Sequence, residues 1–137
     1  MRRGMLLVLG VLPLLVAADR PDLSGTWRLE GNDAETLIIA QTDDEVSISS
    51  KSAAATEVKC GVSGKACDGT ISGEKVSVSY WFNGPMLVEM ATGGKRKDRV
   101  VKTRRSLSSD GQKMEVEVIP IAPVGKSEKL TYVKAQP

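Results

Sequence analysis

The chain of 137 residues contains no histidine. Histidine is the usual general base near neutral pH and the commonest zinc ligand. Its absence excludes the Ser-His-Asp and Cys-His mechanisms of nucleophilic catalysis. No pair of carboxylates has a spacing that marks acid–base chemistry in a pocket. The sequence therefore predicts no catalytic residues and no cofactor, and it indicates that the protein is not an enzyme.

Two cysteines, Cys60 and Cys67, are the only thiols in the chain. They cannot complete a zinc site without further ligands, so we expect no metal site. Their spacing also differs from the C-x-x-C pattern of redox-active pairs. In an exported protein an even number of cysteines favours a disulfide, and the six intervening residues include two glycines, which suit a hairpin loop. We predict a structural Cys60–Cys67 disulfide, with free thiols as the alternative.

A basic segment, GKRKDRVVKTRR at 94–105, holds seven basic residues and one acid. No aromatic residues interleave with it, so it lacks the pattern of a nucleic-acid-binding surface. We interpret it as a solvated strand face with a charged turn, the alternative being a surface for an anionic ligand or partner. If Val101, Thr103 and Arg105 share the inward face, Arg105 reaches the interior and pairs with a carboxylate of the protein or of a ligand. Both faces of this strand are equally mixed, so the alternation leaves that choice open.

The richest apolar cluster of the chain consists of Tyr80, Trp81, Phe82, Met86 and Met90. One interpretation is core packing, and the other is the lining of a pocket at the mouth of a barrel. Together with Arg105, these are the candidate ligand-binding residues. The acidic cluster TDDE at 42–45 is too short a loop for the six or more oxygen ligands of calcium, so we interpret it as a solvated turn.

Residues 1–18 have the pattern of a secretory signal peptide. Arg2 and Arg3 precede an apolar run, and Val16 and Ala18 suit a small-residue cleavage site. The run is shorter than the roughly 20 residues of a membrane span, so we expect no stable membrane insertion after cleavage. Removing the two arginines lowers the net charge from +2 to zero. We predict an exported protein, periplasmic or secreted, whose mature domain is 19–137.

The mature chain alternates apolar and polar residues with a period of two, interrupted by turn residues. This pattern predicts strands at 24–30, 35–41, 45–50, 56–60, 75–82, 86–91, 98–108, 113–120 and 129–134. No segment has a convincing helical period. Consecutive short hairpins favour a closed barrel, which also leaves no exposed strand edge. We therefore predict an all-β fold, a small antiparallel up-and-down β-barrel of about eight to nine strands.

The first predicted strand contains Gly25, Thr26 and Trp27 in the stretch SGTW. The glycine lets the backbone bend at the start of the strand, and we expect the indole of Trp27 to close one end of the barrel. This pattern resembles the G-x-W signature of lipocalins and related calycin barrels. Such proteins usually place an arginine of the last strand across the tryptophan. Here that region has Lys129 and Lys134, and a lysine serves more weakly as the cation.

The wider layout is similar to that of small exported bacterial lipocalin-like proteins. Two further motifs support the resemblance: FNG at 82–84 precedes an apolar strand, and LSSDG at 107–111 precedes another. The resemblance spans 22–134 and implies the fold, with Gly25 and Trp27 in structural positions. It does not identify a ligand.

Two classes of function follow. The first is a binding protein that holds a small apolar or amphipathic molecule inside the barrel. The second is a protein-interaction module, such as an exported proteinase inhibitor, since some bacterial inhibitors combine a similar barrel with one disulfide. A packed structural barrel without a ligand is a further alternative. The expected partners are thus a small hydrophobic ligand or a protein, and not a nucleic acid.

Overall fold

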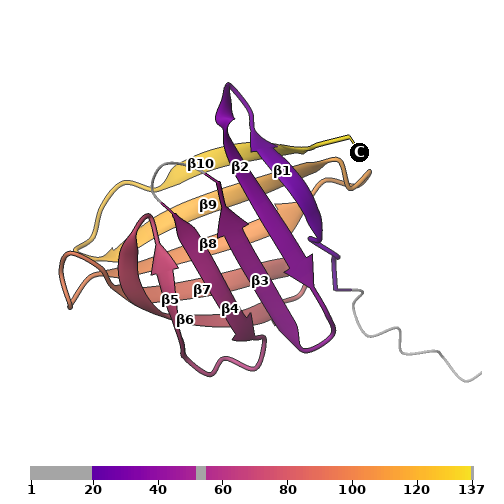
Figure 1. The fold of residues 1–137 in the computed structure, drawn as a ribbon. Helices are drawn as coiled ribbons and strands as arrows, with labels where there is room; N and C mark the ends of the chain where they lie inside the picture. The colour runs from indigo at the N-terminus through magenta and orange to yellow at the C-terminus, as the bar shows by residue number, and fades with distance from the viewer. Residues whose placement is uncertain (1–19, 52–54, 137) are drawn as a thin grey trace, which may run out of the picture.

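The computed structural model describes residues 20–51 and 55–136, which form one closed antiparallel barrel (Figure 1). The order around the barrel is β1-β10-β9-β8-β7-β6-β5-β4-β3-β2, so that each strand pairs with its neighbours in sequence and β1 closes the ring against β10. Its ten strands are β1 Gly25–Leu29, β2 Asn32–Gln41, β3 Glu45–Ser50, β4 Thr56–Gly61, β5 Cys67–Ile71, β6 Glu74–Asn83, β7 Met86–Gly93, β8 Val100–Leu107, β9 Lys113–Ala122 and β10 Glu128–Lys134. The predicted fold class is confirmed. The part of the chain described contains no helix long and apolar enough to cross a membrane; the predicted signal at 1–18 lies outside it.

One strand, β5, is absent from the sequence prediction. Its residues CDGTI contain turn-forming types, yet they pair along their whole length with β6. On the other side β5 shares a single registered pair with β4, Glu57 opposite Thr70. A Cβ at Gly69 would lie 3.0 Å from Val58 Cγ2, so the glycine permits the close approach of these two strands. Tertiary pairing, not local propensity, makes this segment a strand.

The disulfide joins the same two strands. Cys60 and Cys67 are bonded, with their Cα atoms 5.7 Å apart, as the sequence predicts. Cys60 is buried in the core, whereas Cys67 is half-buried at the start of β5. The covalent bond therefore reinforces the place where the hydrogen-bonded ladder of the barrel is thinnest.

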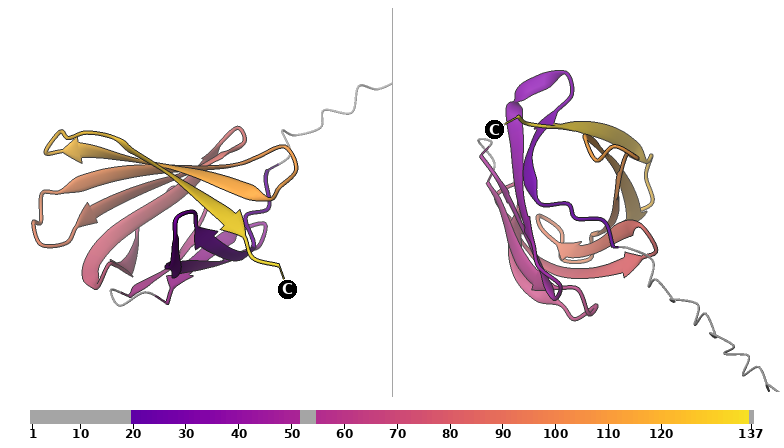
Figure 2. Two further views of the ribbon diagram at one scale, coloured as in Figure 1. Left: turned by 90° about the horizontal axis from the view of Figure 1, so that it is seen from above. Right: turned by 90° about the vertical axis from the view of Figure 1, so that its right-hand side faces the viewer.

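The barrel has one closed end, which we define by Leu23, Trp27, Tyr80, Leu87 and Met114, all fully buried. The chain before β1 passes across the opening of the barrel here (Figure 2, right). Gln41 holds that segment, because its side chain accepts a hydrogen bond from Leu23 N at 3.0 Å and donates one to Pro21 O at 2.9 Å.

Trp27 lies beneath this crossing segment. Its Nε1 donates a hydrogen bond to Leu23 O at 2.9 Å, and Lys134 Nζ lies 5.7 Å from the centre of the indole. Gly25 precedes it with a φ of +143°, and a Cβ there would lie 3.0 Å from Lys134 Cε. The SGTW pattern thus combines a buried indole with a glycine that leaves room for the lysine stem.

Candidate functional site

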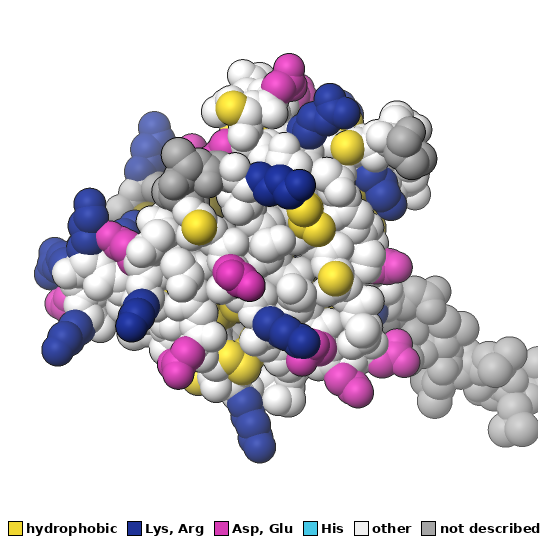
Figure 3. Space-filling view, in the orientation of Figure 1, with side chains coloured by type: hydrophobic (Ala, Val, Ile, Leu, Met, Phe, Trp, Pro, Cys, Tyr) yellow, Lys and Arg dark blue, Asp and Glu magenta, His cyan; other side chains and the backbone are white. Residues whose placement is uncertain are grey.

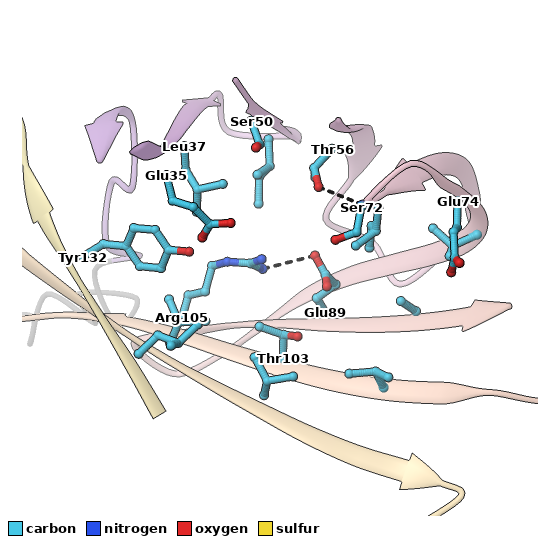
Figure 4. Close-up of a pocket in the computed structure, with 18 of the residues that line it drawn as sticks. Glu35, Leu37, Ser50, Thr56, Ser72, Glu74, Glu89, Thr103, Arg105 and Tyr132 are labelled. Atoms are coloured by element: carbon cyan, nitrogen blue, oxygen red, sulfur yellow. Dashed lines mark hydrogen bonds and ion pairs between the residues drawn. The ribbon is translucent and has the colours of Figure 1, made fainter. Parts of the chain in front are cut away.

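A cavity of about 360 Å³ lies inside the barrel, and Figure 4 draws most of its lining residues. None of the five residues that define the closed end lines it, so it lies toward the other end of the barrel. We call this the open end. The cavity is lined by apolar side chains on eight of the ten strands and by polar and charged ones. The apolar lining residues are Leu37, Ile48, Ile71, Val76, Ala91, Val101, Val116, Val118 and Leu130. The charged and aromatic ones are Glu35, Glu74, Glu89, Arg99, Arg105 and Tyr132.

Three side chains form a hydrogen-bonded network at the inner part of this cavity. Arg105 Nη1 donates to Glu89 Oε1 at 3.2 Å, and Tyr80 Oη donates to the same oxygen at 2.8 Å. Register explains the arrangement, because Tyr80 on β6 lies directly opposite Glu89 on β7, and Glu89 lies opposite Thr103 on β8. Arg105, two residues further along β8, therefore points into the barrel diagonally from Glu89. The carboxylate that meets the inward arginine belongs to the protein itself.

The three side chains of this network are buried, so their electrostatic interactions are only weakly screened by water. Arg105 is 8% exposed, Glu89 is 5% exposed and Tyr80 is fully buried. Desolvation is the largest single effect and opposes the charge of Arg105, but the Glu89 carboxylate, together with Tyr80 and Tyr132, more than offsets it, so the pKa of the guanidinium is raised. Burial, followed by the nearby Glu89 carboxylate, raises the pKa of Tyr80. Arg105 therefore stays charged and the Tyr80 hydroxyl stays a hydrogen-bond donor.

A second polar group faces the network across the cavity. Figure 4 shows the hydroxyl of Tyr132, on β10, and the carboxylate of Glu35, on β2, directed toward the region of the Arg105 guanidinium. Burial and the Glu35 carboxylate raise the pKa of Tyr132, so its hydroxyl also remains protonated. The cavity thus combines an aliphatic wall with a few converging hydrogen-bonding groups, the usual chemistry of a small-molecule site.

Of the six candidate ligand-binding residues, only Arg105 lines this cavity. Tyr80 lies deeper, in the core, and reaches the network through its hydroxyl. Phe82 is half-buried against the core, with the Arg20 guanidinium 5.1 Å from its ring centre. Trp81, Met86 and Met90 are each half-buried, at positions that alternate with the inward ones of β6 and β7. The reason is the period of two, which divides a contiguous apolar cluster between the two faces of the sheet.

Glu89 and Tyr132 are site residues that sequence reasoning missed. The sequence does carry a signal for Glu89, since it is the single charge within the apolar stretch MLVEMA. In the structure its side chain is buried. A charge in such a run needs a buried partner. No comparable signal marks Tyr132, which lies in an ordinary alternating strand.

The basic segment divides between the cavity and the surface. Arg99 and Arg105 line the cavity, whereas Lys95, Arg96 and Lys97 occupy the turn between β7 and β8. Lysine and arginine side chains gather at this end of the molecule, toward the left in Figure 3. Within 20–51 and 55–136, no group of three or more acidic or cysteine side chains is placed to hold a metal ion.

The sequence matches no protein-family model and no curated protein. Solved structures nonetheless share the fold. A "REP1-NXSQ fatty acid transporter" superposes with a TM-score of 0.68 at 16% identity, over 85% of this chain and 98% of that one. A mutant of the fluorescent protein UnaG superposes with a TM-score of 0.61 at 19% identity, over 83% of this chain and 96% of that one. The chain is thus similar to these proteins as a lipocalin-like, calycin-type barrel, which confirms the predicted resemblance at the level of fold.

Proposed function

We propose that this chain is an exported binding protein that holds one small apolar or amphipathic molecule inside its barrel. The observation that carries the proposal is the interior cavity of about 360 Å³. Its volume lies within the range of about 300–1,000 Å³ that is usual for ligand pockets. Its aliphatic wall favours an apolar chain or ring, because burial of apolar surface drives such binding. The similarity in fold to a fatty acid transporter supports a ligand with a large apolar part.

Export is the second part of the proposal. The signal-like pattern at 1–18 supports it, and the Cys60–Cys67 disulfide is compatible with an oxidising compartment. We expect the mature protein, starting at Asp19, in the periplasm or in the medium. Intact-mass analysis of natively exported material tests this, and a chain that retains Met1 to Ala18 would contradict it.

Binding is tested on protein purified from its own compartment. Native mass spectrometry followed by extraction identifies any bound small molecule, and calorimetry with that molecule is expected to show a negative heat-capacity change from burial of apolar surface. Ala91→Leu places a larger side chain in the cavity and is expected to abolish binding. The neighbouring Thr92, exposed on the other face of β7, offers the matched control Thr92→Leu, which should bind normally. Absence of a bound molecule, together with no binding of fatty acids, fatty alcohols or sterols, would overturn the proposal.

A further inference from the structure

The cavity contains an arginine whose charge is already neutralised. Arg105 forms an ion pair with Glu89, their nearest atoms 3.2 Å apart, and both side chains are at least nine-tenths buried. A ligand carboxylate at this point would gain the attraction of Arg105 and suffer the repulsion of Glu89 at nearly the same distance. An arginine that is paired in this way does not favour an anion as an unpaired one would.

The other charged residues that line the cavity also disfavour an anionic ligand. Three carboxylates line the cavity, those of Glu35, Glu74 and Glu89, against the two guanidinium groups of Arg99 and Arg105. Glu35 is directed toward the same part of the cavity as the Arg105 guanidinium (Figure 4). An anionic head group would therefore enter a pocket whose carboxylates outnumber its cations.

The network also leaves hydrogen-bonding capacity unused. Both bonds to Glu89 end on Oε1, and within the described residues its Oε2 accepts none. Arg105 donates through Nη1, while its buried Nε has no partner there. Side by side, the pair thus offers an acceptor and further N–H donors. A buried donor such as Arg105 Nε is normally satisfied, by water or by a ligand.

We propose that the cavity selects amphiphiles whose polar end is uncharged and both donates and accepts hydrogen bonds, such as a hydroxyl or a primary carboxamide. Such a group donates to Glu89 Oε2 and accepts from Arg105, and it brings no charge into the pocket. A carboxylate can only accept and an ammonium can only donate, so each leaves one member of the pair unsatisfied. This inference rests on the proposed function and specifies its ligand class.

The test compares amphiphiles that share one chain: dodecanol, dodecanamide, dodecanoate and dodecylammonium. Their affinities for the full mature protein are measured by calorimetry at a pH where the acid is ionised and the amine protonated. We expect the alcohol and the amide to bind at least about tenfold more tightly than either ion. A dodecanoate or dodecylammonium affinity equal to or above that of dodecanol would overturn the inference while leaving the proposed function intact. If none of the four binds, the inference is overturned, whereas the proposed function is decided separately by the molecule that co-purifies with the protein and by the wider ligand panel.

Glu89→Gln supplies the second arm of the test. The variant removes one negative charge, retains the shape of the side chain and leaves Arg105 without a counter-charge. Dodecanoate affinity is expected to rise by about tenfold or more, so that the ion now binds at least as well as the alcohol. Glu115→Gln, on β9 with an exposed side chain, changes the net charge equally and should leave the order of affinities unchanged. Unaltered discrimination in Glu89→Gln would overturn the inference, and if that variant does not fold the order in the wild-type protein still decides it.

Discussion

The two ends of the barrel are made by the same strands but differ in packing. At the closed end the side chains of Trp27, Tyr80, Leu87 and Met114 fill the axis and none is exposed to solvent. At the open end the same strands surround a cavity of about 360 Å³. The difference shows that closure of the sheet does not decide whether a barrel of this size is solid. The sizes of the inward side chains decide it.

The taper is visible along single strands. On β7 the inward positions run Leu87, Glu89, Ala91 and Gly93 from the closed end to the open end, and the side chains become progressively smaller toward the open end. On β9 the inward Met114 is fully buried at the closed end, whereas the smaller Val116 and Val118 line the cavity. Because the inward side chains of neighbouring strands become smaller toward the same end, a space remains at that end of the barrel. The backbone hydrogen bonds between the strands are not weakened, since they do not depend on side-chain size.

The largest expected effect concerns the closed end. Trp27→Ala should lower the free energy of unfolding by about 3–5 kcal/mol, because it removes a fully buried indole and leaves a cavity. Denaturant unfolding measures the change. Trp81→Ala, at a half-buried position of β6 that alternates with Tyr80, is the matched control and should cost distinctly less. Equal costs for the two tryptophans would remove the distinction between the closed end and the outer surface.

The disulfide is expected to contribute the next largest effect. Its cysteines are seven residues apart, and closing so short a loop in the unfolded chain stabilises by about 2–3 kcal/mol in the loop-entropy model. Because β4 and β5 share one registered pair, we expect reduction of the disulfide to open the junction between these two strands, which we call the seam, before the rest of the barrel. Unfolding of oxidised and reduced protein gives the energy, and amide hydrogen exchange locates the loss. If protection fell uniformly over the barrel, the seam would not be the weak point.

The two ends can be compared directly by introducing a larger side chain at each of them. Val46→Leu inserts one methylene at a fully buried position of the closed half and should cost about 1–3 kcal/mol through overpacking. Ala91→Leu adds more atoms but projects into the cavity, so its cost should be less than about 1 kcal/mol. The measurement is the free energy of unfolding of the two variants. A greater cost for Ala91→Leu would mean that the cavity does not accommodate the added side chain.

The fold could be predicted from the sequence because most strands show a clear alternation of apolar and polar residues. EVSISS and KMEVEV alternate cleanly, and burial of Val46, Ile48, Met114 and Val116 follows from that alternation. It did not reach β5, whose pairing with β6 overrides the turn propensity of its residues. Strand ends were also misjudged: β2 begins at Asn32 because that residue pairs with Leu29 beyond the apolar part of the strand.

The site was less predictable than the fold. Whether Arg105 points inward depends on the register between β7 and β8, and both faces of its strand are too mixed to reveal it. The apolar cluster around Trp81 was a weaker guide, since consecutive residues of a strand cannot share one face. Glu89 would have been the more informative residue, because a lone charge inside an apolar strand must find a partner. Register, which couples segments far apart in sequence, is the information that a single strand lacks.

The smallest expected effect depends on pH and again concerns the closed end. Asp22 lies in the segment that crosses above Trp27, and its Oδ1 accepts a hydrogen bond from Ser24 N at 2.9 Å. That bond, aided by the Ser24 side chain, lowers the pKa of Asp22 below its usual value.

A lowered pKa in the folded state means that the carboxylate stabilises the fold above the unfolded pKa of about 3.9, and that this contribution disappears as the pH falls through the folded value. Asp22→Asn should therefore destabilise at neutral pH, by less than about 1 kcal/mol because the side chain is exposed, and the difference from wild type should shrink as the pH falls below about 3.9 and vanish below the folded-state pKa. Asp68→Asn, at an exposed position of β5, controls for the loss of one negative charge. A difference for Asp22→Asn that stays constant over this range would show that the Asp22 carboxylate does not help to hold the segment crossing the closed end, which would leave that role to contacts such as those of Gln41 and Leu23.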